Sequence, residues 1–200
     1  MSQEINDVSY CVGMSVAMSL KQQNLETLNP DALAEAIKDS FSGKAEKFNA
    51  DEAQVIIQNY LQQISEKQFA VNKEAGENFL NENKTKAGIT TTTSGLQYEV
   101  ITEGAGKTPA ATDVVEVHYH GTLINGTVFD SSIQRGTPTS FGVNQVIKGW
   151  TEALQLMKEG SKYRLYIPQD LAYGAHPHPG GPIEPFMALI FDVELLSVKN

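Results

Sequence analysis

The first forty residues combine long apolar stretches with short polar breaks, a pattern typical of helices. Residues 8–22 are apolar on nearly every side, and although parts of this stretch alternate as a strand would, a helix is favoured. Asn29 and Pro30 supply an N-cap and a first helical residue for a second helix. The pattern predicts that this helix runs through Phe41 and ends at Gly43.

A third helical stretch loses its apolar face along its length. Asn49 or Asp51 can cap it, and it could extend to about Ala87. Its apolar residues recur at helical spacing, closely at first and then sparsely: Ala53, Ile57, Tyr60, Leu61 and Ile64, followed by Val71, Ala75 and Phe79. A long helix with a sparse apolar face buries little of itself. We therefore expect its second half to be a solvated stalk.

The pattern then changes to the two-residue period of strands. Within residues 113–123 the apolar side chains fall on one face and the polar ones on the other: Val115, Val117 and Tyr119 against Glu116, His118 and His120. Asn125-Gly126 predicts a hairpin to a return strand that contains VFD. Further strands are predicted in three ranges, 96–101, 162–168 and 187–198, and one short helix is predicted from Trp150 to Gly160. An antiparallel sheet with one helix on one face is an α+β domain.

Proline, which interrupts regular secondary structure, is distributed unevenly along the chain. Pro30 is alone in the first hundred residues, whereas the other seven prolines lie from Pro109 onward. We expect four segments: a helical dimerisation module (1–48), a long stalk helix (49–88), a hinge (89–95) and the sheet domain (96–200). The first helices are too small to cover their own apolar faces, so we expect a symmetric homodimer through residues 8–64. The alternative is that they pack on the second half of their own chain.

Composition narrows the class of protein. The 200 residues carry 15 basic and 24 acidic side chains, a net charge of −9 spread over both halves, which argues against nucleic acid as a partner. The single cysteine, Cys11, is expected to be a small buried apolar residue. No apolar run approaches the ~20 residues of a membrane span. The start, MSQEINDV, lacks a signal-peptide pattern, so we expect a cytoplasmic protein; the alternative is a periplasmic or cell-surface protein given as its mature form.

Four stretches of the second half occur in order with short spacers: VHYHGTLINGTVFDSS, VIKGWTEALQLM, IPQDLAYG and LIFDVELL. Together they resemble the FKBP family of peptidyl-prolyl cis–trans isomerases, the tacrolimus-binding immunophilins, over about residues 95–198. The layout of the first half is similar to the dimeric bacterial branch that includes macrophage infectivity potentiator proteins. That branch has an N-terminal dimerisation module, a long stalk helix and a C-terminal FKBP domain.

The resemblance implies an apolar pocket with Trp150 as its floor. It implies that Asp130 pairs with Arg135, supported by Tyr119. The backbone N–H of Ile147 and the hydroxyl of Tyr173 would bind substrate carbonyls. The implied catalytic residues are Tyr119, Phe129, Asp130, Ile147, Trp150 and Tyr173. The implied substrate- and inhibitor-binding residues are Arg135, Phe141, Val146, Ile183 and Phe191.

The resemblance also implies an activity and partners. The chain would accelerate Xaa-Pro isomerisation in unfolded or partly folded polypeptides, would bind macrolides such as tacrolimus and rapamycin, and would need no cofactor. A V-shaped homodimer could hold clients between its two pockets as a chaperone. The alternative is a binding module that docks a partner without useful turnover. The complete set of pocket residues favours the enzyme.

Asp130 is not expected to act as an acid or base. Rotation about a Xaa-Pro bond breaks no covalent bond, and its barrier of ~18–20 kcal/mol arises from amide resonance. A catalyst has to favour the twisted amide over both planar forms, which an apolar pocket with fixed donors and a carboxylate dipole can do. Taken alone, Asp130 would be an ordinary turn residue and the aromatic residues ordinary core.

Some positions depart from the family pattern or suggest other chemistry. Glu184-Pro185 stands where the family has two prolines, and Thr139 stands where many members have a pocket aromatic residue. These departures affect the expected drug affinity and substrate preference. His176 and His178 share one proline-rich loop but are too few to predict a metal site, so none is expected. His118 and His120 are expected to be solvated.

Overall fold

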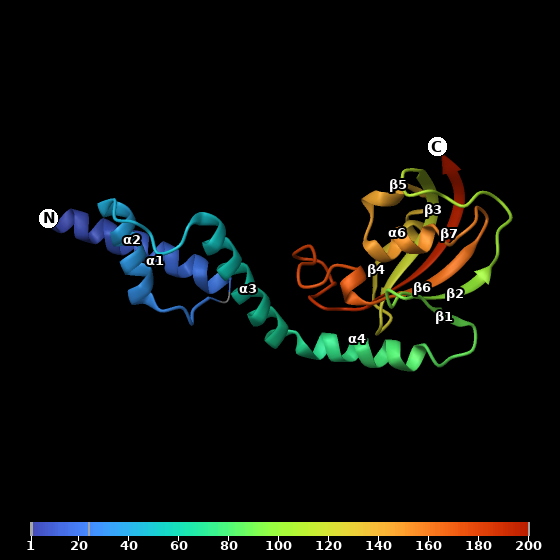
Figure 1. Ribbon diagram of the computed structural model, residues 1–200, viewed down its shortest axis with the longest axis horizontal. Coiled ribbons are helices and arrows are strands. Elements are labelled where there is room, and N and C mark those ends of the chain that lie inside the picture. The colour runs from blue at the N-terminus through green and yellow to red at the C-terminus, as the bar shows by residue number, and fades with distance from the viewer. Residues whose placement is uncertain (1, 24, 200) are drawn as a thin grey trace. The chain divides into compact units, whose positions relative to one another are not determined.

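The computed structural model describes residues 2–23 and 25–199, which fall into two compact units that divide between Ile64 and Ser65 (Figure 1). The first unit holds α1 (Gln3–Gln22), α2 (Pro30–Ser42) and most of α3 (Ala50–Gln68). The second begins with the end of α3 and α4 (Ala70–Asn83) and continues into a mixed sheet-and-helix domain. None of the helices in the described ranges has the length and apolar character to cross a membrane. The α+β fold expected from the sequence is confirmed.

The local signals around α2 act as predicted. The side chain of Asn29 accepts hydrogen bonds from the N–H groups of Asp31 and Ala32, over 2.9 and 3.3 Å. Pro30 is the first helical residue, where its missing N–H is not needed. The helix ends at Gly43, which adopts a left-handed conformation with φ of 68°.

The helix α1 leaves its apolar residues exposed within the single chain. None of its residues is buried, and Val8, Val12 and Val16, which share one face at four-residue spacing, are 58%, 57% and 47% exposed. Cys11 was expected to be buried and is exposed. That expectation is wrong for the single chain, because α1 is apolar nearly all round and no other helix of its unit covers it.

The expected helix over residues 49–88 is interrupted. Its start is a capping box: the Asn49 side chain accepts from the N–H of Glu52 over 2.9 Å, and the Glu52 carboxylate accepts from the N–H of Asn49 over 3.0 Å. The helix breaks at Phe69, where φ is −109° and ψ is 22°. The chain has neither proline nor glycine there, and nothing in the structure explains the break.

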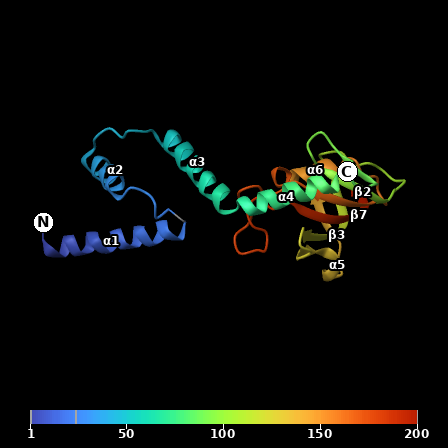
Figure 2. The ribbon, with the colours of Figure 1, turned by 90° about the horizontal axis from the view of Figure 1, so that it is seen from below.

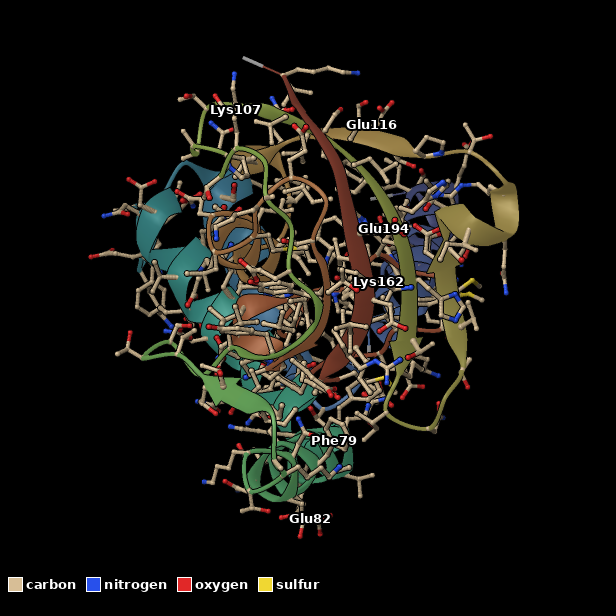
Figure 3. The ribbon with its side chains drawn as sticks, turned by 90° about the vertical axis from the view of Figure 1, so that its right-hand side faces the viewer. Phe79, Glu82, Lys107, Glu116, Lys162 and Glu194 are labelled. Carbon is tan, nitrogen blue, oxygen red and sulfur yellow. The ribbon has the colours of Figure 1, made fainter. Side chains whose placement is uncertain are left out.

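The second half of this stretch, α4, is not the solvated stalk that its sparse apolar face indicated. Gly76 and Asn83 are buried, and the ring of Phe79 lies 6.0 Å from that of Tyr166 on the sheet. Figure 3 shows Phe79 on the side of α4 that faces the sheet and Glu82 on the opposite side. Gly76 allows this contact, because a Cβ atom there would lie only 3.2 Å from Cβ of Ala188.

Seven antiparallel strands form one sheet with the order β1-β2-β6-β7-β3-β4, and β5 pairs with β3. The strands are β1 (Ile89–Thr91), β2 (Gln97–Thr102), β3 (Val114–Leu123), β4 (Val128–Ser131), β5 (Thr139–Gly142), β6 (Lys162–Ile167) and β7 (Leu189–Lys199). The helical segments among them are α5 (Ser132–Arg135), η1 (Val143–Gln145), α6 (Lys148–Leu154) and η2 (Gln169–Leu171). In Figure 1 α6 lies against one face of the sheet.

Alternation along β3 sets the two faces of the sheet as predicted. Val115, Val117 and Tyr119 are buried in the core between the sheet and α6, and the residues between them are half-buried. The hairpin at Asn125-Gly126 is present, with Gly126 at φ of 85°. The fixed alternation therefore points Tyr119 toward the helix-covered face.

Several predicted boundaries differ from the structure, and two of the differences lie in the second half of the chain. Residues 89–95 were expected to be a hinge, yet β1 within them pairs with β2, because the β-branched Thr90 and Thr91 suit an edge strand. The short helix was expected to end at Gly160 and ends at Leu154. Beyond it the chain makes tight turns that bury Met157 completely, and Gly160 serves the turn into β6 with φ of 88°.

Candidate functional site

A cavity of about 620 Å³ opens in the second unit, on the face of the sheet that carries α6. Side chains from β3, β4, β5, α6, β7 and the loop between β6 and β7 surround it. The lining residues are Tyr119, Phe129, Asp130, Phe141, Gln145, Val146, Ile147, Trp150, Tyr173, Pro177, His178, Gly181, Pro182, Ile183 and Phe191. The cavity size suits a small ligand or a few residues of an extended peptide.

Trp150 is the centre of the aromatic wall. It is 4% exposed, and its ring meets those of Tyr119, Phe141 and Phe191 nearly edge-on at centroid distances of 5.4, 5.8 and 5.2 Å. Such edge-to-face packing is favourable for aromatic rings and fixes their orientation. The wall is therefore a rigid apolar surface rather than a loose cluster.

A glycine on β3 makes room for this wall. Gly121 pairs across the sheet with Phe191, and a Cβ atom at Gly121 would lie 2.6 Å from the ring of Phe129 and 2.9 Å from that of Phe191. These two rings meet edge-on at 5.3 Å above the glycine. Backbone without a side chain at this position thus lets both rings approach the sheet closely.

One polar group of three side chains lies at the edge of the aromatic wall. The hydroxyl of Tyr119 donates to Oδ2 of Asp130 over 2.5 Å, and Nη1 of Arg135 donates to Oδ1 of Asp130. Nη2 of Arg135 also donates to the Tyr119 hydroxyl over 2.9 Å. Burial alone would raise the pKa of Asp130, but the hydrogen bonds from Tyr119 and Arg135 outweigh it and hold this pKa below its ordinary value. Asp130 is therefore a carboxylate at neutral pH.

Two further hydrogen-bond donors belong to residues that line the cavity. The N–H of Ile147 precedes α6, and the hydroxyl of Tyr173 belongs to the loop after η2. In the described parts of the chain neither group has a hydrogen-bond partner. Burial, and then the nearby charge of Asp130, raise the pKa of Tyr173, so its hydroxyl keeps its proton and can donate.

The structure gathers the residues singled out by sequence around this one cavity. Those that line it are Tyr119, Phe129, Asp130, Phe141, Val146, Ile147, Trp150, Tyr173, Ile183 and Phe191. Arg135 does not line it but contacts two residues that do. Asp130 lies in β4 and pairs with Arg135, so it is not merely a turn residue. Thr139 and Glu184, the two departures, lie outside the lining.

Other lining residues were not predicted individually. Gln145 directly precedes the VIKGW motif, and its position was the only signal for it. The rest, Pro177, His178, Gly181 and Pro182, belong to the proline-rich loop between Ala172 and Phe186. His178 lies 5.9 Å from the ring of Tyr173.

Two histidines on the other face of β3 differ from expectation. His118 and His120 were expected to be solvated and are half-buried. Their Nδ1 atoms lie 3.1 and 3.0 Å from the hydroxyls of Ser132 and Ser131. The turn from β4 into α5 covers this part of β3 and brings both serines within reach.

Comparison with known proteins finds matches to one family of proteins in both halves of the chain. Residues 105–196 match the family described as FKBP-type peptidyl-prolyl cis-trans isomerase, and residues 5–100 match the domain amino terminal to it. The FKBP-type 22 kDa peptidyl-prolyl cis-trans isomerase of Escherichia coli K12 is 46% identical, covering 95% of this chain and 93% of the relative. The outer membrane protein MIP of Legionella longbeachae is 43% identical, covering 96% and 85%.

A solved structure extends this similarity to the fold. The crystal structure of FkpA from Escherichia coli matches with a TM-score of 0.65 and 37% identity, covering 98% of this chain and 95% of that one. The similarity therefore includes the helical first half as well as the sheet domain.

Proposed function

This chain belongs to the family of FKBP-type peptidyl-prolyl cis–trans isomerases, and we propose that it accelerates Xaa-Pro rotation by holding a twisted amide in the Trp150 cavity. The single observation that carries this proposal is the joint presence of the aromatic wall and the Tyr119–Asp130–Arg135 group at one cavity. Residues 96–200 would be the isomerase domain. The proline ring would lie against Trp150, between Phe129, Phe141 and Phe191.

The mechanism needs no covalent chemistry. Rotation about the amide raises the energy by ~18–20 kcal/mol because resonance is lost. Water stabilises the polar planar amide, so a dry aromatic wall takes away some of that ground-state advantage. The N–H of Ile147 and the hydroxyl of Tyr173 would hold carbonyls of the peptide on either side of the rotating bond.

The carboxylate would contribute an electric field. In the twisted form the nitrogen keeps its lone pair, so the carbonyl resembles that of a ketone: its carbon is more electrophilic and its oxygen carries less negative charge than in the planar amide. Asp130, fixed by Tyr119 and Arg135, would stabilise that charge distribution without moving. Val146 and Ile183 would complete the apolar contacts of substrate or of a macrolide such as rapamycin.

The first experiment measures cis-to-trans rates of short Leu-Pro and Phe-Pro peptides with the full chain, with and without rapamycin. Acceleration that rapamycin abolishes is the expected result. Binding of rapamycin without acceleration would overturn the enzyme assignment in favour of a binding module. If the chain neither accelerates isomerisation nor binds rapamycin, the assignment of the cavity itself is overturned.

We also propose that the chain acts as a homodimer through residues 8–64 and holds partly folded clients as a chaperone. The exposed apolar stripe of α1 supports the dimer, since such surfaces mark interaction sites. Two linked pockets would raise the effective concentration of a client bound at one of them. The test asks whether a variant that lacks isomerase activity still suppresses the aggregation of an unfolded protein. If the variant loses both the isomerase activity and the suppression of aggregation, a separate chaperone role is contradicted.

For location, we propose the cell envelope. The expectation of a cytoplasmic protein has no support among the relatives, one of which is named an outer membrane protein. The alternative location, periplasm or cell surface, therefore becomes the better proposal. Fractionation of cells that make the full native gene product tests it, and recovery in the cytoplasm alone would reverse it.

A further inference from the structure

The loop between β6 and β7 lines the cavity at one end and touches α4 at the other. Tyr173, Pro182 and Ile183 belong to the lining. Residues 184–188, which close the loop, lie beside the N-terminal half of α4 (Figure 2). A change at this closing segment would therefore move a wall of the cavity.

Asn72 on α4 makes two hydrogen bonds to the closing segment. Its Nδ2 donates to Oε2 of Glu184 over 3.0 Å and to the carbonyl of Pro185 over 3.2 Å. Glu184 is one of the positions that depart from the family pattern, and its side chain gives Asn72 a charged acceptor. A hydrogen bond to a charged group is stronger than one between neutral groups.

The residue that follows this contact holds an unfavourable backbone conformation. Phe186 has a φ of 62°, which is rare for a residue other than glycine, and its side chain is 5% exposed. Its N–H donates to the carbonyl of Gly174 over 2.9 Å, which ties the two ends of the loop together. Such a conformation persists only where the surroundings fix it.

The helix α4 supplies those surroundings because it is itself fixed to the sheet. The ring of Phe79 lies 6.0 Å from that of Tyr166 on β6. Nearby, at the end of the helix, Nδ2 of the buried Asn83 donates to Oε1 of Gln97 on β2 over 3.0 Å. Gly76 then packs against the closing segment itself, where a Cβ atom would be 3.2 Å from that of Ala188. Asn72 thus projects from an anchored helix toward the base of the loop.

We propose that Asn72 is a positioning residue that holds the loop over the cavity, so that the choice among side chains flanking the proline depends on α4. This rests on the proposed isomerase function and deepens it. Pro182 and Ile183 offer an apolar surface to the flanking side chain, so large apolar residues such as leucine gain from a fixed loop more than alanine does. Asn72 does not touch the cavity and would not affect the reacting bond directly.

The test compares kcat and KM of the full chain for Leu-Pro and Ala-Pro peptides. In Asn72→Ala we expect KM for the Leu-Pro peptide to rise by about two- to tenfold, the range of one lost hydrogen bond. We expect kcat to change little and KM for Ala-Pro to change less. Asn72→Gln keeps an amide donor and should restore part of the preference. The matched control is Asn78→Ala, an exposed asparagine on the same helix.

A second measurement does not depend on turnover. Hydrogen exchange of the Phe186 amide should become faster in Asn72→Ala and stay unchanged in Asn78→Ala. An unchanged Leu-Pro to Ala-Pro preference together with wild-type exchange at Phe186 would overturn the inference. An equal loss for both peptides would also overturn it, since that would mean a merely structural role. Failure of the proposed function is distinguishable, because it would appear as absent acceleration in the wild type.

Discussion

The hydroxyl of Tyr119 lies 2.5 Å from Oδ2 of Asp130, and one guanidinium group, that of Arg135, contacts both. The three hydrogen bonds within this group therefore all end on the carboxylate or on the oxygen that supports it. A carboxylate held in this way is a poor base, because its proton affinity is lowered. It is well suited to present a fixed negative charge beside an apolar cavity.

The first prediction concerns that charge. Asp130→Asn keeps the shape of the side chain and removes the charge, so the field acting on the twisted amide is lost. We expect kcat/KM for a Leu-Pro peptide to fall by about tenfold, which corresponds to ~1.4 kcal/mol in the barrier. The measurement is the cis-to-trans rate at several peptide concentrations.

A second aspartate–arginine pair gives the control for this prediction. Asp192 pairs with Arg164 on the sheet, with distances of 2.5 and 2.9 Å, and does not line the cavity. Asp192→Asn should leave kcat/KM close to that of the wild type. Equal effects of the two substitutions, or none at Asp130, would contradict a role for its charge in the reaction.

The second prediction concerns acid pH. The pKa of Asp130 in the folded chain lies below its ordinary value of 3.8. The contribution of this hydrogen-bonded group to stability is thus fully present at pH values well above 3.8 and is lost as the pH falls through the lowered folded pKa. In Arg135→Leu one hydrogen-bond donor and its positive charge are gone while burial still acts, so the pKa of Asp130 should move upward. Carbon NMR of the Asp130 carboxyl group through an acid titration measures this shift.

Arg135→Lys keeps a positive charge with fewer donors, and an intermediate pKa is expected. A titration of Arg135→Leu that coincides with the wild type would contradict the pairing. Above about pH 5 the titration of Asp130 should contribute nothing to the pH dependence of wild-type activity, because this carboxyl group is already ionised there.

The third prediction concerns Gly121. An added methyl group would lie 2.6 Å from the ring of Phe129, so Gly121→Ala has to displace the wall of the cavity. We expect a loss of about 1–3 kcal/mol in the free energy of unfolding and weaker rapamycin binding. Denaturant unfolding and calorimetric titration measure the two effects. In the matched variant Gly142→Ala the new methyl group meets Oε1, Cδ and Cγ of the Gln145 side chain at 2.9, 3.0 and 3.2 Å. This long side chain can turn aside more easily than an aromatic ring in the wall, so smaller losses are expected. Equal losses in both variants would contradict this account.

The sequence was sufficient for those parts of the fold that local chemistry decides. The alternation of β3 places Tyr119 inward, Asn125-Gly126 makes the hairpin, and Asn29-Pro30 starts α2. In each case the residues whose pattern predicts the element are the residues that form it. The ordered motifs then indicated which inward side chains meet at one cavity.

The sequence was insufficient where tertiary packing decides. Gly76 is the only glycine between Gly43 and Gly88, and it indicated no contact by itself; the close approach of Ala188 explains it. The role of Glu184 also depends on Asn72, which lies 112 positions away in the chain. Contacts between residues far apart in the chain leave no periodic pattern in the sequence. The sequence of α4 therefore indicated a solvated helix, although the structure packs it against the sheet domain.

The last prediction concerns the exposed face of α1. Val12 is 57% exposed within the chain and lies between Val8 and Val16 on one face. If this stripe joins two copies, Val12→Asp would bury an unpaired charge at the contact, which is strongly unfavourable. Light scattering should then show the mass of one 21.8 kDa chain for the variant and twice that mass for the wild type. Asn78→Asp adds the same charge on α4 and should remain dimeric.

Because the cavity lies wholly in the second unit, Val12→Asp should still isomerise short peptides at the wild-type rate per chain. A wild type that is monomeric at micromolar concentrations, or a Val12→Asp variant that stays dimeric, would contradict the α1 interface.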